Sequence, residues 1–153
     1  MFKLQTADEI NRDWAEIRSS LLRETGLSGQ GYLDWDVRTG QISWDPAWAD
    51  LFGWPHGIGS GNAGLWEDAI HPHDLGEVME KLNEHLRGLT SVFVARYRLN
   101  SHCGQPHSID TSGLVMARNT IGRPTRVILT SHKIAALEYT MARRYESPLS
   151  RNT

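Results

Sequence analysis

The clearest pattern of hydrophobic and polar positions lies between Gly31 and Gly53. Apolar and polar residues alternate through its first part, as in a half-buried strand. Thr39-Gly40 then supplies a turn, and the alternation resumes on the far side. This segment therefore predicts a β-hairpin, whose apolar positions are Leu33, Trp35, Val37, Ile42 and Trp44.

The period changes to that of a helix directly after the hairpin. Asp45 is a good N-cap and Pro46 suits the first helical position. Gly53 fits the left-handed position that ends a helix. A second, longer helix is expected from Pro72 to about residue 87, because its apolar residues recur at helical spacing. Between these helices, residues 54–64 are rich in glycine and predict a loop.

Both ends of the chain predict helices that flank the central part. Near the N-terminus a capping box at Thr6 precedes an apolar stripe of Ile10, Trp14, Ile17 and Leu21. A closing helix is expected within residues 135–153, followed by a loose tail from residue 147. The expected organisation is an N-terminal helix at 1–26, a domain at 27–134, and a C-terminal helix and tail at 135–153.

Three strands are expected between residues 92 and 134, at 92–99, 107–118 and 125–134. With the hairpin they make five strands, and the intervening helices fall in a single crossover. That order predicts an α+β fold in which a five-stranded antiparallel sheet carries short helices on one face. The simplest pocket in such a fold lies between the sheet and those helices.

Composition excludes several classes of function. The chain has 153 residues and a formal net charge of −2, so it offers no basic footprint for nucleic acid or an anionic membrane. No apolar run is long enough to span a bilayer, and no secretory signal is visible. The single cysteine, Cys103, excludes an internal disulfide and suits a reducing cytoplasm. A cytoplasmic location is therefore expected.

Four segments in order resemble the PAS domain, in the subgroup common in bacterial sensor proteins. They are the hairpin from Gly31 to Trp44, the helix end Leu51-Phe52-Gly53-Trp54, the signature Trp66-Glu-Asp-Ala-Ile-His71-Pro72-His73-Asp74, and the last three strands from Tyr97 onward. The resemblance spans about residues 31–134 and implies the PAS fold. It also implies structural roles for His71, Pro72 and Asp74.

The sequence departs from the family pattern at three points. Cys103-Gly104 replaces the usual Asp-Gly turn, and no tryptophan stands near Ser108. The family's last strand commonly ends in Asp-Ile-Thr, where this chain has Lys133-Ile134-Ala135. The last departure puts the usual coupling to an output domain in doubt.

A small apolar pocket is the expected ligand site of such a domain. The residues expected to line it are Trp35, Trp44, Phe52, Trp66, Ile70, Val78 and Leu82. His85 is a candidate haem ligand, because some PAS domains bind haem through a histidine on the corresponding helix. The alternative is a partly exposed histidine at a helix C-terminus. The cofactor stays unknown, with haem or flavin as alternatives to none, and the Cys103 turn lacks the signature of flavin photosensors.

Metal and enzymatic sites find little support. His71 and His73 straddle a proline without a third ligand at standard spacing, and Gly59 to Gly64 matches a dinucleotide motif by letter but lacks its strand-then-helix context. His102, Cys103 and His107 fall around one turn, where surface residues are the simpler interpretation. No serine-hydrolase, metalloprotease or kinase motif occurs.

The sequence therefore predicts a sensory, non-catalytic PAS module of the kind found in two-component systems. It would sense a small molecule or mediate dimerisation, and pass the signal through its flanking helices to an output domain or partner. The stripe of Ile10, Trp14, Ile17 and Leu21 predicts a parallel homodimer. Packing of that helix on its own sheet is the alternative. A receptor for haem, flavin or an organic acid is the second hypothesis, and a small cone-fold enzyme the third.

Overall fold

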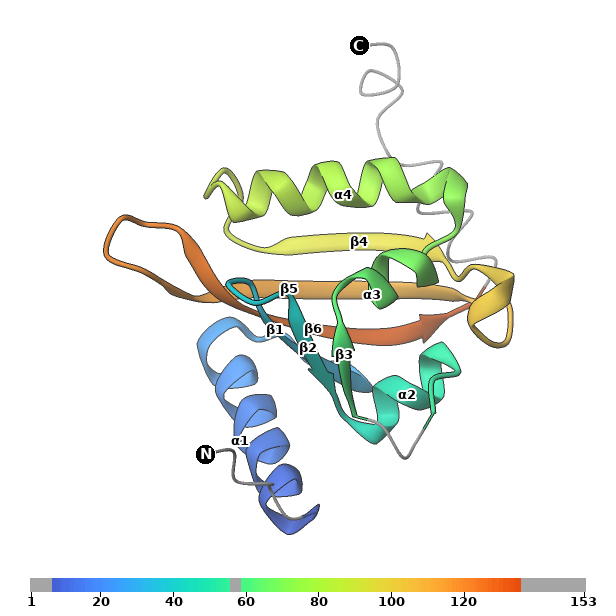
Figure 1. The fold of residues 1–153 in the computed structure, drawn as a ribbon, viewed down its shortest axis with the longest axis horizontal. Coiled ribbons are helices and arrows are strands. Elements are labelled where there is room, and N and C mark those ends of the chain that lie inside the picture. Colours follow the sequence, from blue (N-terminus) through green and yellow to red (C-terminus); the bar gives the residue numbers. More distant parts are fainter. Residues whose placement is uncertain (1–6, 56–58, 136–153) are drawn as a thin grey trace.

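The computed structural model describes residues 7–55 and 59–135, with side chains from residue 14 onward. One antiparallel sheet has the strand order β3-β2-β1-β6-β5-β4 (Figure 1). Its strands are β1 (Gly31–Asp36), β2 (Gln41–Trp44), β3 (Ser60–Asn62), β4 (Phe93–Arg98), β5 (Ser108–Arg118) and β6 (Pro124–Ile134). The helices are α1 (Ala7–Thr25), α2 (Pro46–Phe52), α3 (Gly64–Ala69) and α4 (Pro72–Leu86), with a 3₁₀ turn η1 (Ser101–Cys103). The predicted α+β class is confirmed.

The sheet has one strand more than the sequence predicts. Part of the glycine-rich segment expected to be a loop forms β3, which pairs antiparallel with β2 so that Gln41 faces Asn62. Without β3, the backbone groups on this edge of β2 would be unpaired. Strand pairing of this kind uses only backbone groups, so no alternation of side chains announces it.

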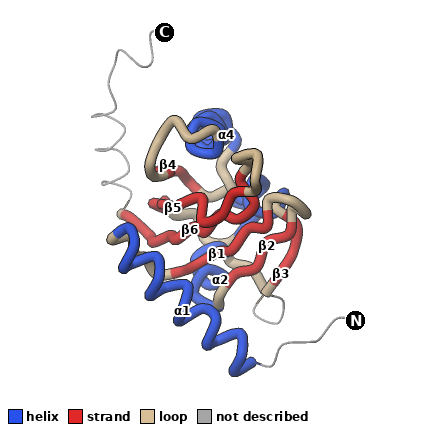
Figure 2. The backbone as a smooth tube through the Cα atoms, turned by 90° about the vertical axis from the view of Figure 1, so that its left-hand side faces the viewer, coloured by secondary structure: helices blue, strands red, loops and turns tan. Residues whose placement is uncertain are grey.

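The two faces of the sheet carry separate apolar cores. The face toward α2, α3 and α4 holds the larger core, which contains the tryptophans of the hairpin and of α2. The opposite face holds a smaller core in which α1 contributes Trp14 and Leu21, and the sheet contributes Tyr32 and Ile128. Figure 2 shows α1 beside β1, at the end of the molecule away from α4. We call the face toward α2, α3 and α4 the inner face, and the face toward α1 the outer face.

Local sequence signals set the ends of α2. Asp45 is its N-cap, and its side chain accepts a hydrogen bond from the Trp48 amide. Pro46 occupies the first turn, and Gly53 ends the helix at φ 70°, in the left-handed region that glycine favours. All three predictions are confirmed. The Thr6 cap lies outside the described residues, and so does the predicted closing helix and tail of residues 135–153, except for residue 135.

Close backbone packing places α2 against the start of β1. A β-carbon built on Gly31 would lie 2.5 Å from the Cα of Trp48, closer than real contacts allow. Only glycine therefore lets α2 approach the sheet this closely. At the other end of the sheet, the β5–β6 hairpin extends beyond its neighbouring strands (Figure 1).

Candidate functional site

The residues predicted to line a pocket gather in the inner core. Six of them are buried and Trp35 is partly buried, so the sequence placed them on the correct face: Trp44, Phe52, Trp66, Ile70, Val78 and Leu82. They pack within one cluster, and three hollows found among the described residues lie at the surface instead. Of the seven, only Trp44 lines one of these hollows. Their role in ligand binding stays a prediction.

An aromatic cluster around α2 contains polar atoms without partners. Trp48 stacks on Phe52 with ring centroids 4.4 Å apart, and Trp44 meets Trp54 edge to face at 4.5 Å. The indole Nε1 atoms of Trp35, Trp44 and Trp48 are buried, and none has a hydrogen-bond partner among the described residues. Buried donors are usually paired, so these three indole groups are exceptions within the described core.

A chain of buried hydroxyl groups crosses the inner face of the sheet. Trp66 Nε1 donates to the Tyr97 hydroxyl at 3.0 Å, which lies 2.7 Å from Thr111 Oγ1. Thr111 Oγ1 in turn lies 2.7 Å from Ser131 Oγ. Burial raises the pKa of Tyr97 to about 12, although its hydrogen bonds act in the opposite direction. The Tyr97 hydroxyl therefore stays protonated and joins α3 to β4, β5 and, through Thr111, β6.

Sequence reasoning missed this chain of hydroxyls. Thr111 and Ser131 face each other across β5 and β6, on the face that also carries the buried Ile109 and Leu129. Two polar residues at predicted inward positions were the available signal.

His85 of α4 bonds to β5 beyond the point where β4 ends. It is 3% exposed, so the expectation of a partly exposed histidine is wrong. Its Nε2 accepts from the Val115 amide at 3.0 Å, and its Nδ1 lies 3.0 Å from the Thr90 carbonyl. These partners fix Nδ1 as the donor and Nε2 as the acceptor. With both nitrogens engaged, the imidazole presents no free atom to a haem iron.

The reason for this burial lies in the sheet. The β4 ladder on β5 ends at Gly113, and β5 is irregular after Val115. The ladder of β4 therefore does not extend to Val115, and the Val115 amide donates to His85 of α4 instead.

The His71-Pro72-His73-Asp74 segment fastens α4 to the end of β4. His71 caps the helix, since its Nδ1 accepts from the His73 amide at 3.1 Å. Asp74 is 1% exposed and accepts from the Arg98 backbone amide at 2.8 Å. The Arg98 guanidinium also forms a forked pair with Asp74, at 2.9 and 3.0 Å. These contacts explain why an aspartate stands at this position.

A second buried carboxylate links α1 to the core. Asp45 is 2% exposed, and its Oδ1 accepts from the amides of Tyr32 (3.0 Å) and Trp48 (2.9 Å). Its Oδ2 lies 3.5 Å from Nη2 of Arg18, whose guanidinium also stands 5.2 Å from the Tyr32 ring centroid. Arg18 is the one residue of α1 that reaches this carboxylate in the described part of the chain. Sequence reasoning identified the cap but not Arg18.

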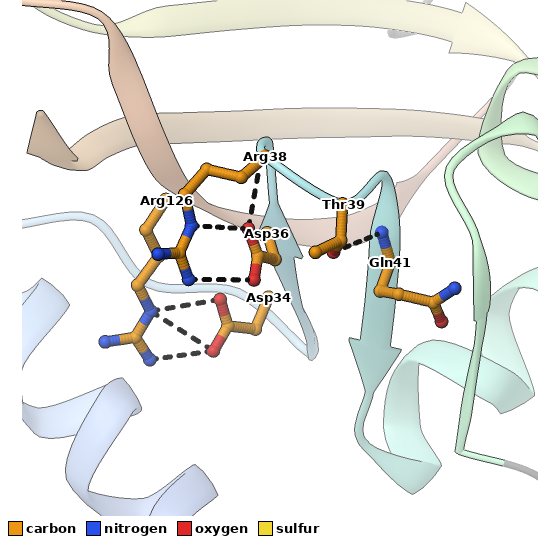
Figure 3. A network of polar contacts seen from close by, with 6 residues as sticks. All are labelled: Asp34, Asp36, Arg38, Thr39, Gln41 and Arg126. Carbon is orange, nitrogen blue, oxygen red and sulfur yellow. Dashed lines mark hydrogen bonds and ion pairs between the residues drawn. The ribbon is translucent and has the colours of Figure 1, made fainter. Parts of the chain in front are cut away.

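The outer face beside α1 is a charged groove. Arg126 binds Asp34 through two nitrogens, at 2.7 to 3.2 Å, and Asp36 pairs with Arg38 (Figure 3). The hydrogen bond from Arg38 lowers the pKa of Asp36, and the bond to Asp34 raises that of Arg126. Asp34 and Arg126 line one side of a hollow, and Trp14 and Ile17 line another.

Within the single chain, the apolar stripe of α1 is largely covered. Trp14 is 6% exposed and Leu21 is fully buried, both against the chain's own sheet, with Ile17 packed beside them. The side chain of Ile10 lies outside the described part. Packing on its own sheet therefore accounts for three of the four residues, and the homodimer stays a prediction.

Two kinds of site are absent from the described residues. No cluster there holds three potential metal ligands, His102, Cys103 and His107 included. None of the described helices is long and apolar enough to cross a membrane.

Comparisons with known proteins agree with this geometry. The family model described as "PAS fold" matches residues 41–131. A sensory box histidine kinase/response regulator from Burkholderia thailandensis superposes with a TM-score of 0.62 at 21% identity, covering 80% of this chain and 91% of that one. The N-terminal domain of a diguanylate cyclase with a PAS/PAC sensor from Marinobacter aquaeolei gives 0.58 at 21% identity, covering 71% and 97%.

A domain of a putative light and redox sensing histidine kinase from Haloarcula marismortui gives a TM-score of 0.58 at 17% identity, covering 78% of this chain and 99% of that one. At identities this low, these superpositions show that the fold is shared and nothing more. Among curated proteins, no match was found. The family match covers more than half of the chain, and the antiparallel sheet with helices on its inner face is the fold that the resemblance implied, with one strand more. The chain belongs to the PAS fold family.

Proposed function

We propose that this chain is a sensory module for signal transduction, in which the state of the core controls the docking of α1. The observation that carries the proposal is the position of Asp45. Its buried carboxylate accepts hydrogen bonds from the Tyr32 amide in β1 and from the Trp48 amide in the first turn of α2. The same carboxylate contacts Arg18 of α1. A ligand or partner that shifts α2 would therefore change the support for α1.

The solved relatives support a sensory role. Their names describe sensory modules attached to a histidine kinase and to a diguanylate cyclase. By analogy, this module would bias an output domain or a separate partner. The helix α1 offers the route for which the contacts are known, whereas the closing segment lacks the family's Asp-Ile-Thr ending.

Hydrogen exchange measured by NMR tests the coupling. Trp14→Glu places a charge in the outer core, so α1 should undock. We expect faster exchange at the amides of Tyr32 and Trp48, which donate hydrogen bonds to Asp45. Exchange should be unchanged at the amide of Arg98, which donates to Asp74.

Two further variants give this experiment its controls. Leu22→Glu makes the same change in charge on the solvent side of α1, where Leu22 is 52% exposed, and should leave all three amides unchanged. Arg18→Ala removes only the contact between α1 and Asp45, so it perturbs the same coupling more mildly. The coupling is refuted if α1 undocks without any effect at Tyr32 and Trp48, or if all amides accelerate together.

A ligand receptor is the second candidate function. It is favoured by the three buried indole N–H groups that lack partners among the described residues. A small molecule with a carbonyl or carboxylate could accept these hydrogen bonds. An absorption spectrum of freshly purified protein, followed by mass spectrometry of the heat-released supernatant, would detect a coloured cofactor or a colourless ligand. Finding neither in stoichiometric amount would favour signalling without a resident ligand.

Dimerisation through α1 remains a prediction of its own. Because Trp14 and Leu21 are already buried, a partner would have to displace α1 or use its exposed side, where Leu22 lies. Light scattering of the purified chain measures its mass directly. A monomeric protein at micromolar concentration would refute the dimer.

A further inference from the structure

The charges of this chain are unevenly distributed along its sequence. The net charge of −2 predicts no footprint for an anionic membrane, but residues 85–135 contain seven arginines and lysines and one acidic residue, Asp110. Three of these arginines pair with a carboxylate: Arg96, Arg98 and Arg126. The remaining basic residues therefore carry the excess of positive charge.

The other three arginines form no ion pair within the described part of the chain: Arg87, Arg118 and Arg123. Arg87 follows the last residue of α4, and the other two flank the turn between β5 and β6. Figure 1 shows these two segments together at the left, where the β5–β6 hairpin extends beyond its neighbours. We call residues 87–91 and 118–123 the basic end.

One side chain joins the two segments of the basic end. Arg118 Nη1 donates to the Leu86 carbonyl at the end of α4, at 3.1 Å, and to the Gly122 carbonyl in the turn, at 2.8 Å. The turn itself is closed by Asn119, whose side-chain oxygen accepts from the Ile121 amide at 3.0 Å. Specific hydrogen bonds therefore hold the basic end in one shape, although all of its residues are exposed.

Two aliphatic side chains stand out from this end. Ile121 is 72% exposed and Leu89 is 63% exposed, and no other large hydrophobic side chain in the described residues is exposed as much. Each lies within two residues of an arginine that has no ion pair. Single exposed aliphatics are normal on protein surfaces, so the question is whether the local structure needs these two.

The local structure requires neither aliphatic residue. Leu89 follows Gly88, which ends α4 at φ 81°, and the Leu89 amide donates to the Glu84 carbonyl at 2.9 Å. At such a helix end, the residue after the glycine commonly packs on an apolar side chain one turn back, but that position is Glu84 here. Ile121 stands in a tight turn, where glycine, proline and small polar residues are favoured. Folding of the chain therefore does not explain either exposed side chain.

We propose that the basic end binds the surface of an anionic lipid bilayer, with its arginines on the lipid phosphate groups and with Leu89 and Ile121 entering the boundary of the acyl chains. A guanidinium presents a planar fork of donors that matches phosphate oxygens. An exposed aliphatic side chain gains free energy when it leaves water. The basic end contains none of the residues that link α1 to the core, so this inference stands apart from the proposed function.

A bilayer suits this surface better than a folded partner does. A standard protein interface buries about 800 Å² on each partner around a packed apolar core. Here the two aliphatic side chains project from separate segments, with charge between them. A fluid lipid surface needs no shape complementarity, so two projecting side chains and three cations are enough for weak, reversible attachment.

Sedimentation of the full chain with lipid vesicles tests the proposal. We expect binding to vesicles of phosphatidylcholine mixed with phosphatidylserine, and binding about tenfold weaker or less to phosphatidylcholine alone. Added salt should weaken the binding to the mixed vesicles, because it screens the charges. Equal binding to both kinds of vesicle, or none to the mixed vesicles, would overturn the proposal.

Matched variants locate the surface. Arg123→Gln should weaken binding to the mixed vesicles about fivefold, whereas Lys133→Gln, at the opposite end of β6, should change it by less than about twofold. Ile121→Ser should weaken binding about tenfold, and Leu65→Ser, at a 43% exposed position on α3, should leave it unchanged. Equal effects of the two charge changes would show unspecific attraction and refute the site. Full binding by Ile121→Ser would refute the entry of its side chain into the bilayer.

An acidic protein is the other class of partner that three arginines could attract. Soluble poly-glutamate presents carboxylates without an apolar phase, so we expect it to bind more weakly than the mixed vesicles and to bind Ile121→Ser as it binds the wild type. If poly-glutamate bound more tightly than the vesicles at the same salt concentration, the basic end would fit an acidic protein, and the lipid proposal would be wrong.

Discussion

Replacing Asp45 with alanine should destabilise the domain strongly, because one carboxylate performs two separate tasks. Removing the N-cap of α2 costs about 1 kcal/mol. The Tyr32 amide, also bonded to Asp45, then stays buried without a partner, which costs about 1–3 kcal/mol. The sum is about 2–4 kcal/mol of the free energy of unfolding. Urea denaturation followed by tryptophan fluorescence measures it.

Milder substitutions separate the tasks of Asp45. Asp45→Asn keeps an oxygen that can accept from both amides, so it should cost about 1 kcal/mol or less. Arg18→Ala should also cost about 0–1 kcal/mol, because the Arg18 side chain is 50% exposed and lies 3.5 Å from the carboxylate. Asp68→Ala, an exposed carboxylate on α3, serves as the control and should change stability by about 0.5 kcal/mol at most. If Asp45→Ala and Asp45→Asn were equally stable, the hydrogen bonds from the Tyr32 and Trp48 amides to Asp45 would not contribute to stability, and the reasoning would fail.

Three further predictions concern the core, two glycines and His107. Tyr97→Phe leaves the Trp66 indole unpaired and should cost about 1–3 kcal/mol in urea denaturation; a loss below about 0.5 kcal/mol would contradict the buried chain. Gly31→Ala should cost about 1–3 kcal/mol through overlap with α2, whereas Gly76→Ala, which has open space, should stabilise α4 by about 0.5–1 kcal/mol; similar effects would contradict the close approach. The lowered pKa of His107 means that the unfolded chain takes up its proton more readily. Its contribution is therefore present above about pH 6.5 and falls as the solution becomes more acidic. His107→Phe should flatten this decline in thermal melts at pH 5–7, and an unchanged profile would refute it.

Local signals in the sequence were enough to predict much of the fold. The hairpin, the cap at Asp45 and the end at Gly53 depend on neighbouring residues, and they form where the sequence predicts. The strand β3 could not be predicted, because its three residues pair through the backbone with an edge that exists only in the folded sheet.

The candidate site was predictable only in part. Inward-facing apolar residues were recognisable by their period, so the inner core was predicted well. The role of His85 depends on an irregularity in β5, and Arg18 meets Asp45 across 27 positions of sequence. Contacts of this kind are set by tertiary packing, and a polar residue on an amphipathic helix carries no sign of them.

The coupling between α1 and the core must work in both directions, because linkage is reciprocal. The most direct test removes the charge of Asp45, which joins the core to Arg18 of α1, and measures α1. It compares the amide exchange of residues 16–22 in Asp45→Asn with that of the wild type, with the amides of α4 as the internal reference. We predict that the α1 amides exchange several times faster while those of α4 keep their wild-type rates. Unchanged protection of α1 would contradict the proposal that the core controls its docking.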